Sequence, residues 1–151
     1  MVTRQTLRTF DRHGIACQVL TKGGLRAVRD FELLAKNPEN KFSVTLTLDD
    51  PSKSLQWEPG AALPAERIES LRLAHAAGIS TWVSFEPVLD PEAVYRMIEE
   101  TADFVDLYKV GKLNYHPHAK TIDWPEFREH VVECLDLSGS EYYLKRDLLA
   151  A

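Results

Sequence analysis

Apolar and polar side chains alternate in two stretches of the chain, FSVTLTLD at 42–49 and ISTWVSFE at 79–86. A period of two is typical of a β-strand, because successive side chains point to opposite faces of a sheet. In both stretches one face is apolar and suits packing against helices, whereas the other is richer in polar groups and ends in a carboxylate. Further strands are predicted at 15–21, 104–110 and 141–144.

Helical patterns occupy most of the chain between these strands. Residues 64–77 and 91–101 carry apolar side chains at helical spacing, and each stretch begins with a proline. Asp123 is the expected N-cap of a later helix, and Thr3 is the candidate N-cap of the first. Helices are expected at 3–13, 25–35, 64–77, 91–101, 124–137 and 146–151, with a long loop at 50–63.

The alternation of strands with helices predicts an α/β fold with a parallel sheet. A parallel strand that is buried on both faces usually reads as a continuous apolar run, whereas 42–49 keeps one polar face. This polar face is therefore expected to line a lumen. The prediction is a partial (β/α) TIM-type barrel of about five parallel strands, with helices on its outer face, formed by residues 1–151 as a single domain.

One charged residue stands at the end of each predicted strand. In barrels and doubly wound sheets, the chemistry lies at the carboxyl ends of the strands. The pattern therefore predicts a functional site at that edge. The five residues are Lys22, Asp49, Glu86, Lys109 and Lys145.

Composition narrows the functional classes. The chain has 151 residues, of which 44% are hydrophobic, and its net charge of −5 excludes an overall basic footprint for nucleic acid. No apolar run approaches the roughly 18 residues of a membrane helix. The chain has only two cysteines, Cys17 and Cys134. The low cysteine count and the missing apolar run predict a cytoplasmic protein with reduced thiols and no membrane partner.

Three further groups of residues are candidates for a chemical role. His116 and His118, with His130 or Cys134, fit no standard zinc spacing, so a solvated loop is favoured and no metal ligand is assigned. Lys109 is a candidate Schiff-base lysine of a lyase. The basic residues of the predicted strand-end rim either meet a nucleic-acid backbone or form a solvated face. They are Lys109, Lys112, Lys120, Lys145 and Arg146.

Four segments follow one another in a recognisable order: LTKGGLRAVRD, FSVTLTLDD, a WEP in the next loop, and AERIESLRLAHAAGISTWVSFEPVLDP. This order, with a late strand followed by basic residues, resembles the radical SAM family. It is most similar to the spore photoproduct lyase-like branch, also called DNA repair photolyase-like. The resemblance covers about 15–145, and the order of the elements carries it rather than any single motif.

The resemblance implies a partial (β/α)6 barrel whose lumen holds S-adenosylmethionine against a [4Fe–4S] cluster. In the intact family, reductive cleavage of the sulfonium yields a deoxyadenosyl radical that abstracts hydrogen from a substrate. Lys22 matches the family's lysine that contacts the carboxylate of S-adenosylmethionine. Thr45 or Thr47 matches a hydroxyl near the polar groups of this cofactor. Glu86 is the remaining residue of the implied cofactor-binding site. Glu58 and Arg67 match an E-P motif and a following arginine, as a ligand contact or as a structural ion pair. The implied substrate-side residues are Asp49, Glu58, Arg67, Lys109, Lys112 and Lys145.

The chain departs from the family at the cluster motif, because no Cys-x3-Cys-x2-Cys is present. The resemblance therefore implies the carboxyl-terminal portion of such an enzyme, either truncated or split. No cluster is expected on this chain, and the chain alone is expected to be inactive. The expected partner is the missing amino-terminal half of the barrel, or a second copy. The alternative is a non-catalytic binding or assembly module that pairs with a cluster-bearing chain.

Overall fold

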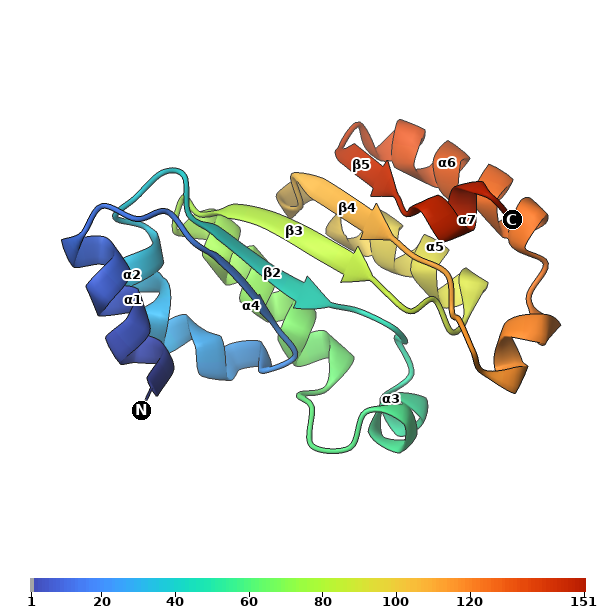
Figure 1. Ribbon diagram of the computed structural model, residues 1–151, viewed down its shortest axis with the longest axis horizontal. Coiled ribbons are helices and arrows are strands. Elements are labelled where there is room, and N and C mark those ends of the chain that lie inside the picture. Colours follow the sequence, from blue (N-terminus) through green and yellow to red (C-terminus); the bar gives the residue numbers. More distant parts are fainter. Residues whose placement is uncertain (1) are drawn as a thin grey trace.

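The computed structural model describes residues 2–151. These residues contain one five-stranded sheet, and every strand is parallel to its neighbours. The strands stand in sequence order, so their carboxyl ends share one edge, here called the carboxyl rim (Figure 1). Their bounds are β1 (Gln18–Thr21), β2 (Lys41–Thr45), β3 (Ser80–Phe85), β4 (Leu107–Val110) and β5 (Glu141–Leu144).

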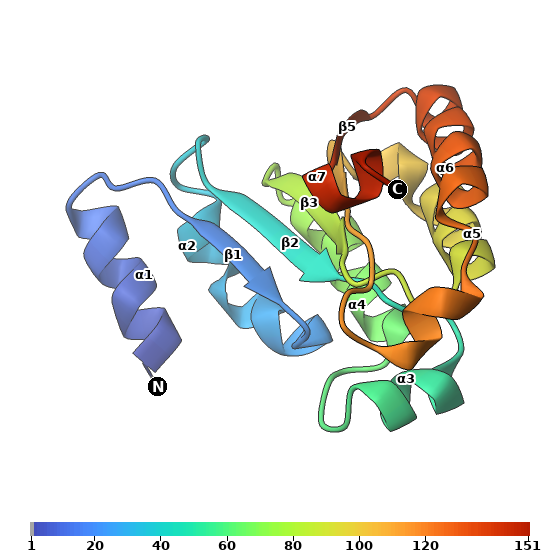
Figure 2. The same cartoon turned by 45° about the vertical axis from the view of Figure 1, so that its right-hand side comes forward.

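Helices connect successive strands, and the longer ones pack together on one side of the sheet (Figures 1 and 2). Asp50, Asp90 and Asp123 each accept a hydrogen bond from a backbone N–H in the first turn of α3, α5 and α6, as N-caps do. The α-helices are α1 (Val2–Arg12), α2 (Phe31–Leu34), α3 (Pro51–Trp57), α4 (Pro64–Ala76), α5 (Pro91–Thr101), α6 (Trp124–Ser138) and α7 (Arg146–Leu149). The 3-10 helices are η1 (Gly24–Asp30), η2 (Ala102–Phe104) and η3 (Pro117–Thr121).

The core lies between the sheet and these helices. Val44, Val83 and Tyr108 are register neighbours on adjacent strands and have no exposed surface. The rings of Phe85 and Tyr108 stack with centroids 5.7 Å apart. The hydroxyl of Tyr108 lies 2.8 Å from that of Thr101 on α5, and burial raises the pKa of Tyr108 to about 12. The apolar face of each central strand is thus the face that packs on helices.

The predicted α/β class is confirmed: five parallel strands form an open, partial barrel with helices outside. Several boundaries differ. The expected loop at 50–63 contains α3, the expected helix at 25–35 is mainly the 3-10 helix η1, and Thr3 lies inside α1 rather than capping it. The strand predicted at 104–110 is shorter in the structure, where β4 begins at Leu107. Tyr108 and Val110 lie in the core, and Lys109 lies on the opposite face.

β1 and β5 each pair with one neighbour in the described part of the chain, so both are edge strands. β1 is also shorter than predicted, because it begins at Gln18 rather than Ile15. Between residues 2 and 151 there is no helix with the length and apolarity needed to cross a membrane.

Candidate functional site

The sheet face opposite the helices is the candidate site, and we call it the lumen face. Its residues alternate with the core residues along each strand. The strand register aligns Thr45, Ser84, Lys109 and Tyr143 in one row across the sheet, and Leu20, Ser43, Trp82 and Leu107 in the row below. Leu20 and Tyr143 remain 51% and 52% exposed, so the outer strands leave this face open to solvent.

Two buried polar atoms beside or on the lumen face have no hydrogen-bond partner: Thr47 Oγ1 and Trp82 Nε1. The side chains are almost fully buried, with 1% of Thr47 and 7% of Trp82 exposed. Buried polar groups in folded proteins are nearly always hydrogen-bonded, and an unpaired one calls for an explanation. Trp82 Nε1–H needs an acceptor, whereas the Thr47 hydroxyl can donate or accept.

Lys109 and Trp82 form the centre of the lumen face. The Lys109 ammonium lies 3.8 Å from the centroid of the Trp82 ring. A cation over an indole face is attracted by the ring quadrupole, most strongly where water is partly excluded. This contact places the Lys109 side chain along the sheet, over the Trp82 ring.

At the carboxyl rim, Glu86 follows β3 and pairs with Lys145, which follows β5, at 3.0 Å. Gly111, which follows β4, makes room for this carboxylate: a Cβ on Gly111 would lie 3.0 Å from Glu86 Cδ and Oε1. Gly111 was not among the residues predicted from the sequence to form the site. Its only signal was a glycine between the two lysines of the segment KVGK.

Lys22, Glu58 and Arg67 form one ionic network. Glu58 pairs with Lys22 at 2.7 Å and with Arg67 at 2.6 Å. Arg67 is only 1% exposed and donates further hydrogen bonds to the carbonyls of Ala62 and Thr45. Burial acts to raise the pKa of Glu58, but hydrogen bonds from Lys22 and Arg67 outweigh it and lower that pKa. The network joins the end of β1 to α4 and β2.

Two of the predicted substrate-side residues contact neighbouring helices. Asp49 pairs with Arg96 on α5 at 2.7 Å, and the hydrogen bond from Arg96 lowers the pKa of Asp49. Lys112 lies 5.3 Å from the centroid of the Trp124 ring. The structure therefore brings Glu86 together with Lys145, and Lys22 with Glu58 and Arg67. Within residues 2–151 no ion pair joins these two groups.

The histidine loop packs against α3 rather than forming a ligand set. The Trp57 ring contacts those of His116 and His118, with centroids 5.2 and 5.8 Å away. Across residues 2–151 there is no cluster of three side chains suited to holding a metal ion. Cys17 lies before β1 and Cys134 lies in α6, and burial raises the pKa of both thiols.

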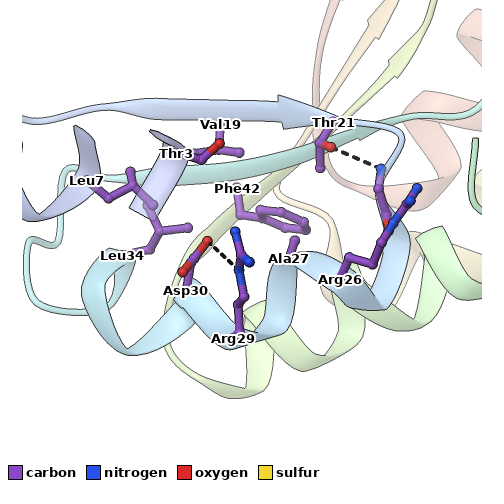
Figure 3. A pocket seen from close by; sticks show the side chains of 11 residues that line it. Thr3, Leu7, Val19, Thr21, Arg26, Ala27, Arg29, Asp30, Leu34 and Phe42 are labelled. Atoms are coloured by element: carbon purple, nitrogen blue, oxygen red, sulfur yellow. Dashed lines mark hydrogen bonds and ion pairs between the residues drawn. The ribbon is translucent and has the colours of Figure 1, made fainter. Parts of the chain in front are cut away.

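A small cavity of about 160 Å³ lies on the helix side of β1, between α1 and η1. Figure 3 shows Asp30 and Arg29 facing each other beside Phe42 in this cavity. Arg4 of α1 also pairs with Asp30, at 2.8 Å. Asp30 Oδ1 therefore attaches α1 through Arg4, whereas Oδ2 pairs with the neighbouring Arg29 of η1. This cavity is separate from the lumen face.

Comparison with solved structures agrees with this architecture. Streptococcus suis SuiB bound to S-adenosylmethionine superposes with a TM-score of 0.73 at 13% identity, over 94% of this chain and 36% of SuiB. A domain of pyruvate-formate lyase-activating enzyme from Bacteroides vulgatus superposes with a TM-score of 0.72 at 13% identity, over 94% of this chain and 88% of the domain. No family model and no curated relative matches the sequence.

At this identity the likeness establishes the fold. The chain spans about a third of the length of SuiB (36%). The neighbours share the partial-barrel fold that the resemblance implies. They do not support the spore photoproduct lyase-like branch in particular.

Proposed function

We propose that the lumen face binds S-adenosylmethionine and that the chain supplies the cofactor and substrate side of a radical SAM enzyme similar to the spore photoproduct lyase-like branch. One observation carries the proposal: the uncovered polar face holds two buried polar groups without partners, Thr47 Oγ1 and Trp82 Nε1. The same fold occurs in SuiB bound to S-adenosylmethionine.

The residues present fit this cofactor. It carries a carboxylate, an ammonium, a positive sulfonium, ribose hydroxyls and an adenine ring, and the site offers groups of matching chemistry. Lys22 is proposed for the carboxylate, Glu86 for a cationic group, and Thr45 and Thr47 for the polar parts. Gly111 leaves the space in which the Glu86 carboxylate lies. When bound, the cofactor supplies the radical chemistry, and these side chains bind it and orient it.

The residues do not fit an iron–sulfur cluster. A [4Fe–4S] cluster is held by cysteine thiolates, and the described residues contain Cys17 and Cys134 only, on separate elements. No reaction step is therefore derived through a cluster on these residues. We propose that a cluster-bearing segment or chain pairs with this one, and the open edge of β1 is a surface suited to such pairing.

The substrate side is proposed to be formed by Lys109, Lys112 and Lys145. Asp49, Glu58 and Arg67 support it indirectly, because each is held in an ion pair. The Schiff-base alternative assigns Lys109 as the nucleophile that attacks a carbonyl. Borohydride trapping of a carbonyl compound at Lys109 would favour that alternative.

Calorimetric titration with S-adenosylmethionine tests the proposal. Lys22→Met is expected to weaken binding by about ten- to a hundredfold, the value of one charge-assisted hydrogen bond. Lys53→Met is the matched control, because Lys53 is also an exposed lysine in an ion pair, with Asp90 at 3.4 Å. No binding by the parent, or equal affinity in the parent and Lys22→Met, would count against the proposal.

A further inference from the structure

The outer surface of α5 and α6 carries all of the protein's net charge. The two helices contain seven carboxylates and two arginines, a net charge of −5, which equals that of the whole chain. All seven acidic side chains are exposed. They are Glu92, Glu99, Glu100, Glu126, Glu129, Glu133 and Asp136.

Neither arginine lies unpaired among these carboxylates. Arg96 is paired with Asp49, outside the two helices, at 2.7 Å. Arg128 donates hydrogen bonds to the carbonyls of Leu149 and Ala151 at the end of the chain. The acidic groups are therefore not neutralised within the surface itself.

An apolar groove of about 440 Å³ runs between α5 and α6 through this acidic surface. Its apolar lining includes Tyr95, Ile98, Ala102 and Leu137. Leu137 is 88% exposed, so a partner that covers the groove buries it. Glu92, Glu99 and Arg96 line the same groove, and the Arg96 guanidinium is paired with Asp49.

The groove also lies in a negative electrostatic field. Cys134 lines it from α6. Burial raises the pKa of the Cys134 thiol, and the nearby carboxylates of Glu133, Glu99 and Glu92 raise it further. Carboxylates from both helices therefore act on one point in the groove.

We propose that the α5–α6 groove docks a basic amphipathic helix of a partner protein. The apolar side of such a helix covers Leu137 and fills the groove, and its lysines or arginines meet the acidic rim. This is the helix-in-groove mode of recognition, with the charge pattern setting specificity and rate of association. Nucleic acids and anionic membranes are repelled by this surface, because they carry the same sign of charge.

The groove is remote from the lumen face, because α5 and α6 pack on the opposite side of the sheet. The inference is thus independent of cofactor binding. Variants in the groove are expected to leave affinity for S-adenosylmethionine unchanged.

A synthetic helical peptide with leucines at i, i+3, i+4 and i+7 and lysines on both flanks is the probe. Its binding is measured by fluorescence polarisation, beside a peptide with glutamates in place of the lysines. The lysine peptide is expected to bind at least about tenfold more tightly, with affinity falling as salt rises. Equal binding of the two peptides, or binding of neither, overturns the proposal.

Two charge-matched double variants separate local contact from long-range attraction. Glu99→Lys with Glu133→Lys is expected to weaken binding by about tenfold. Asp11→Lys with Glu39→Lys changes the net charge equally, at exposed positions on another part of the molecule, and is expected to have a much smaller effect. Equal losses in the two variants overturn the proposal.

Thiol protection locates the bound peptide. Alkylation followed by mass spectrometry is expected to show Cys134 protected by the lysine peptide, with Cys17 as the internal reference on another part of the molecule. Leu137→Ser is expected to abolish that protection, and because Leu137 is so exposed the variant keeps its fold. Equal protection of both cysteines, or a reversible dimer of the protein that Leu137→Ser disrupts, overturns the proposal, the dimer by making a second copy the occupant.

Discussion

Glu58→Gln is expected to be among the more damaging single changes in this chain. The substitution keeps the shape of the side chain but removes the charge that meets Arg67 at 2.6 Å. Arg67 is 1% exposed, so its guanidinium is left without a counter-charge in the interior. Removing one partner of a buried ion pair costs about 3–5 kcal/mol. A domain of this size loses about 2–4 °C of Tm per kcal/mol, so Tm is expected to fall by about 6–20 °C.

Lys22→Met provides the control on the same carboxylate. Lys22 pairs with Glu58 at 2.7 Å, but its side chain is 41% exposed. An exposed ion pair contributes about 0–1 kcal/mol, so this variant is expected to stay close to the parent in urea and thermal unfolding. The same result keeps Lys22→Met usable in the cofactor titration, because a change in affinity then does not reflect unfolding.

The pH dependence of unfolding gives a second measurement. The pKa of Glu58 is lowered in the folded protein from an ordinary value of 4.5. Its contribution to stability is therefore complete above about pH 4.5 and is lost as the pH falls through the lower folded pKa. The difference in unfolding free energy between the parent and Glu58→Gln is expected to shrink over that acidic window. Costs of equal size for Glu58→Gln and Lys22→Met, or a difference independent of pH, would refute this reasoning.

Two further predictions concern the site and its surroundings. Gly111→Ala is expected to displace the Glu86 carboxylate from Lys145, because the added Cβ meets Glu86 Cδ and Oε1 at 3.0 Å. Since the Glu86 side chain is 40% exposed, the cost to stability is expected to be about 1 kcal/mol or less, and a urea midpoint far below the parent's would contradict it. Arg96→Gln is expected to raise the pKa of Asp49, since the hydrogen bond from Arg96 is what lowers it; carboxyl NMR titration of parent and variant measures the change, and an unmoved pKa would show that the pair does not form in solution.

The local elements were predictable because they depend on neighbouring residues. The alternation in FSVTLTLD and ISTWVSFE identified β2 and β3 together with the faces that pack on helices. Asp123 followed by Trp124 and Pro125 predicted the start of α6, and the aspartate accepts the expected hydrogen bond. In each case a period or a capping signal of a few residues was sufficient, so no distant contact was needed.

What only the tertiary structure decided was which charged groups meet. From the sequence, the five strand-end residues formed one expected set, and Glu58 and Arg67 were left between a ligand contact and an ion pair. In the fold, Asp49 turns to Arg96 on α5, Lys145 to Glu86, and Lys22 to Glu58. Side chains separated by many residues find partners according to sheet order and loop paths, which no local pattern encodes. The space left by Gly111 and the acidic groove between α5 and α6 depend on the same packing. The helix α3 is different, because Asp50 and Pro51 are a local signal for its start that the sequence reading missed.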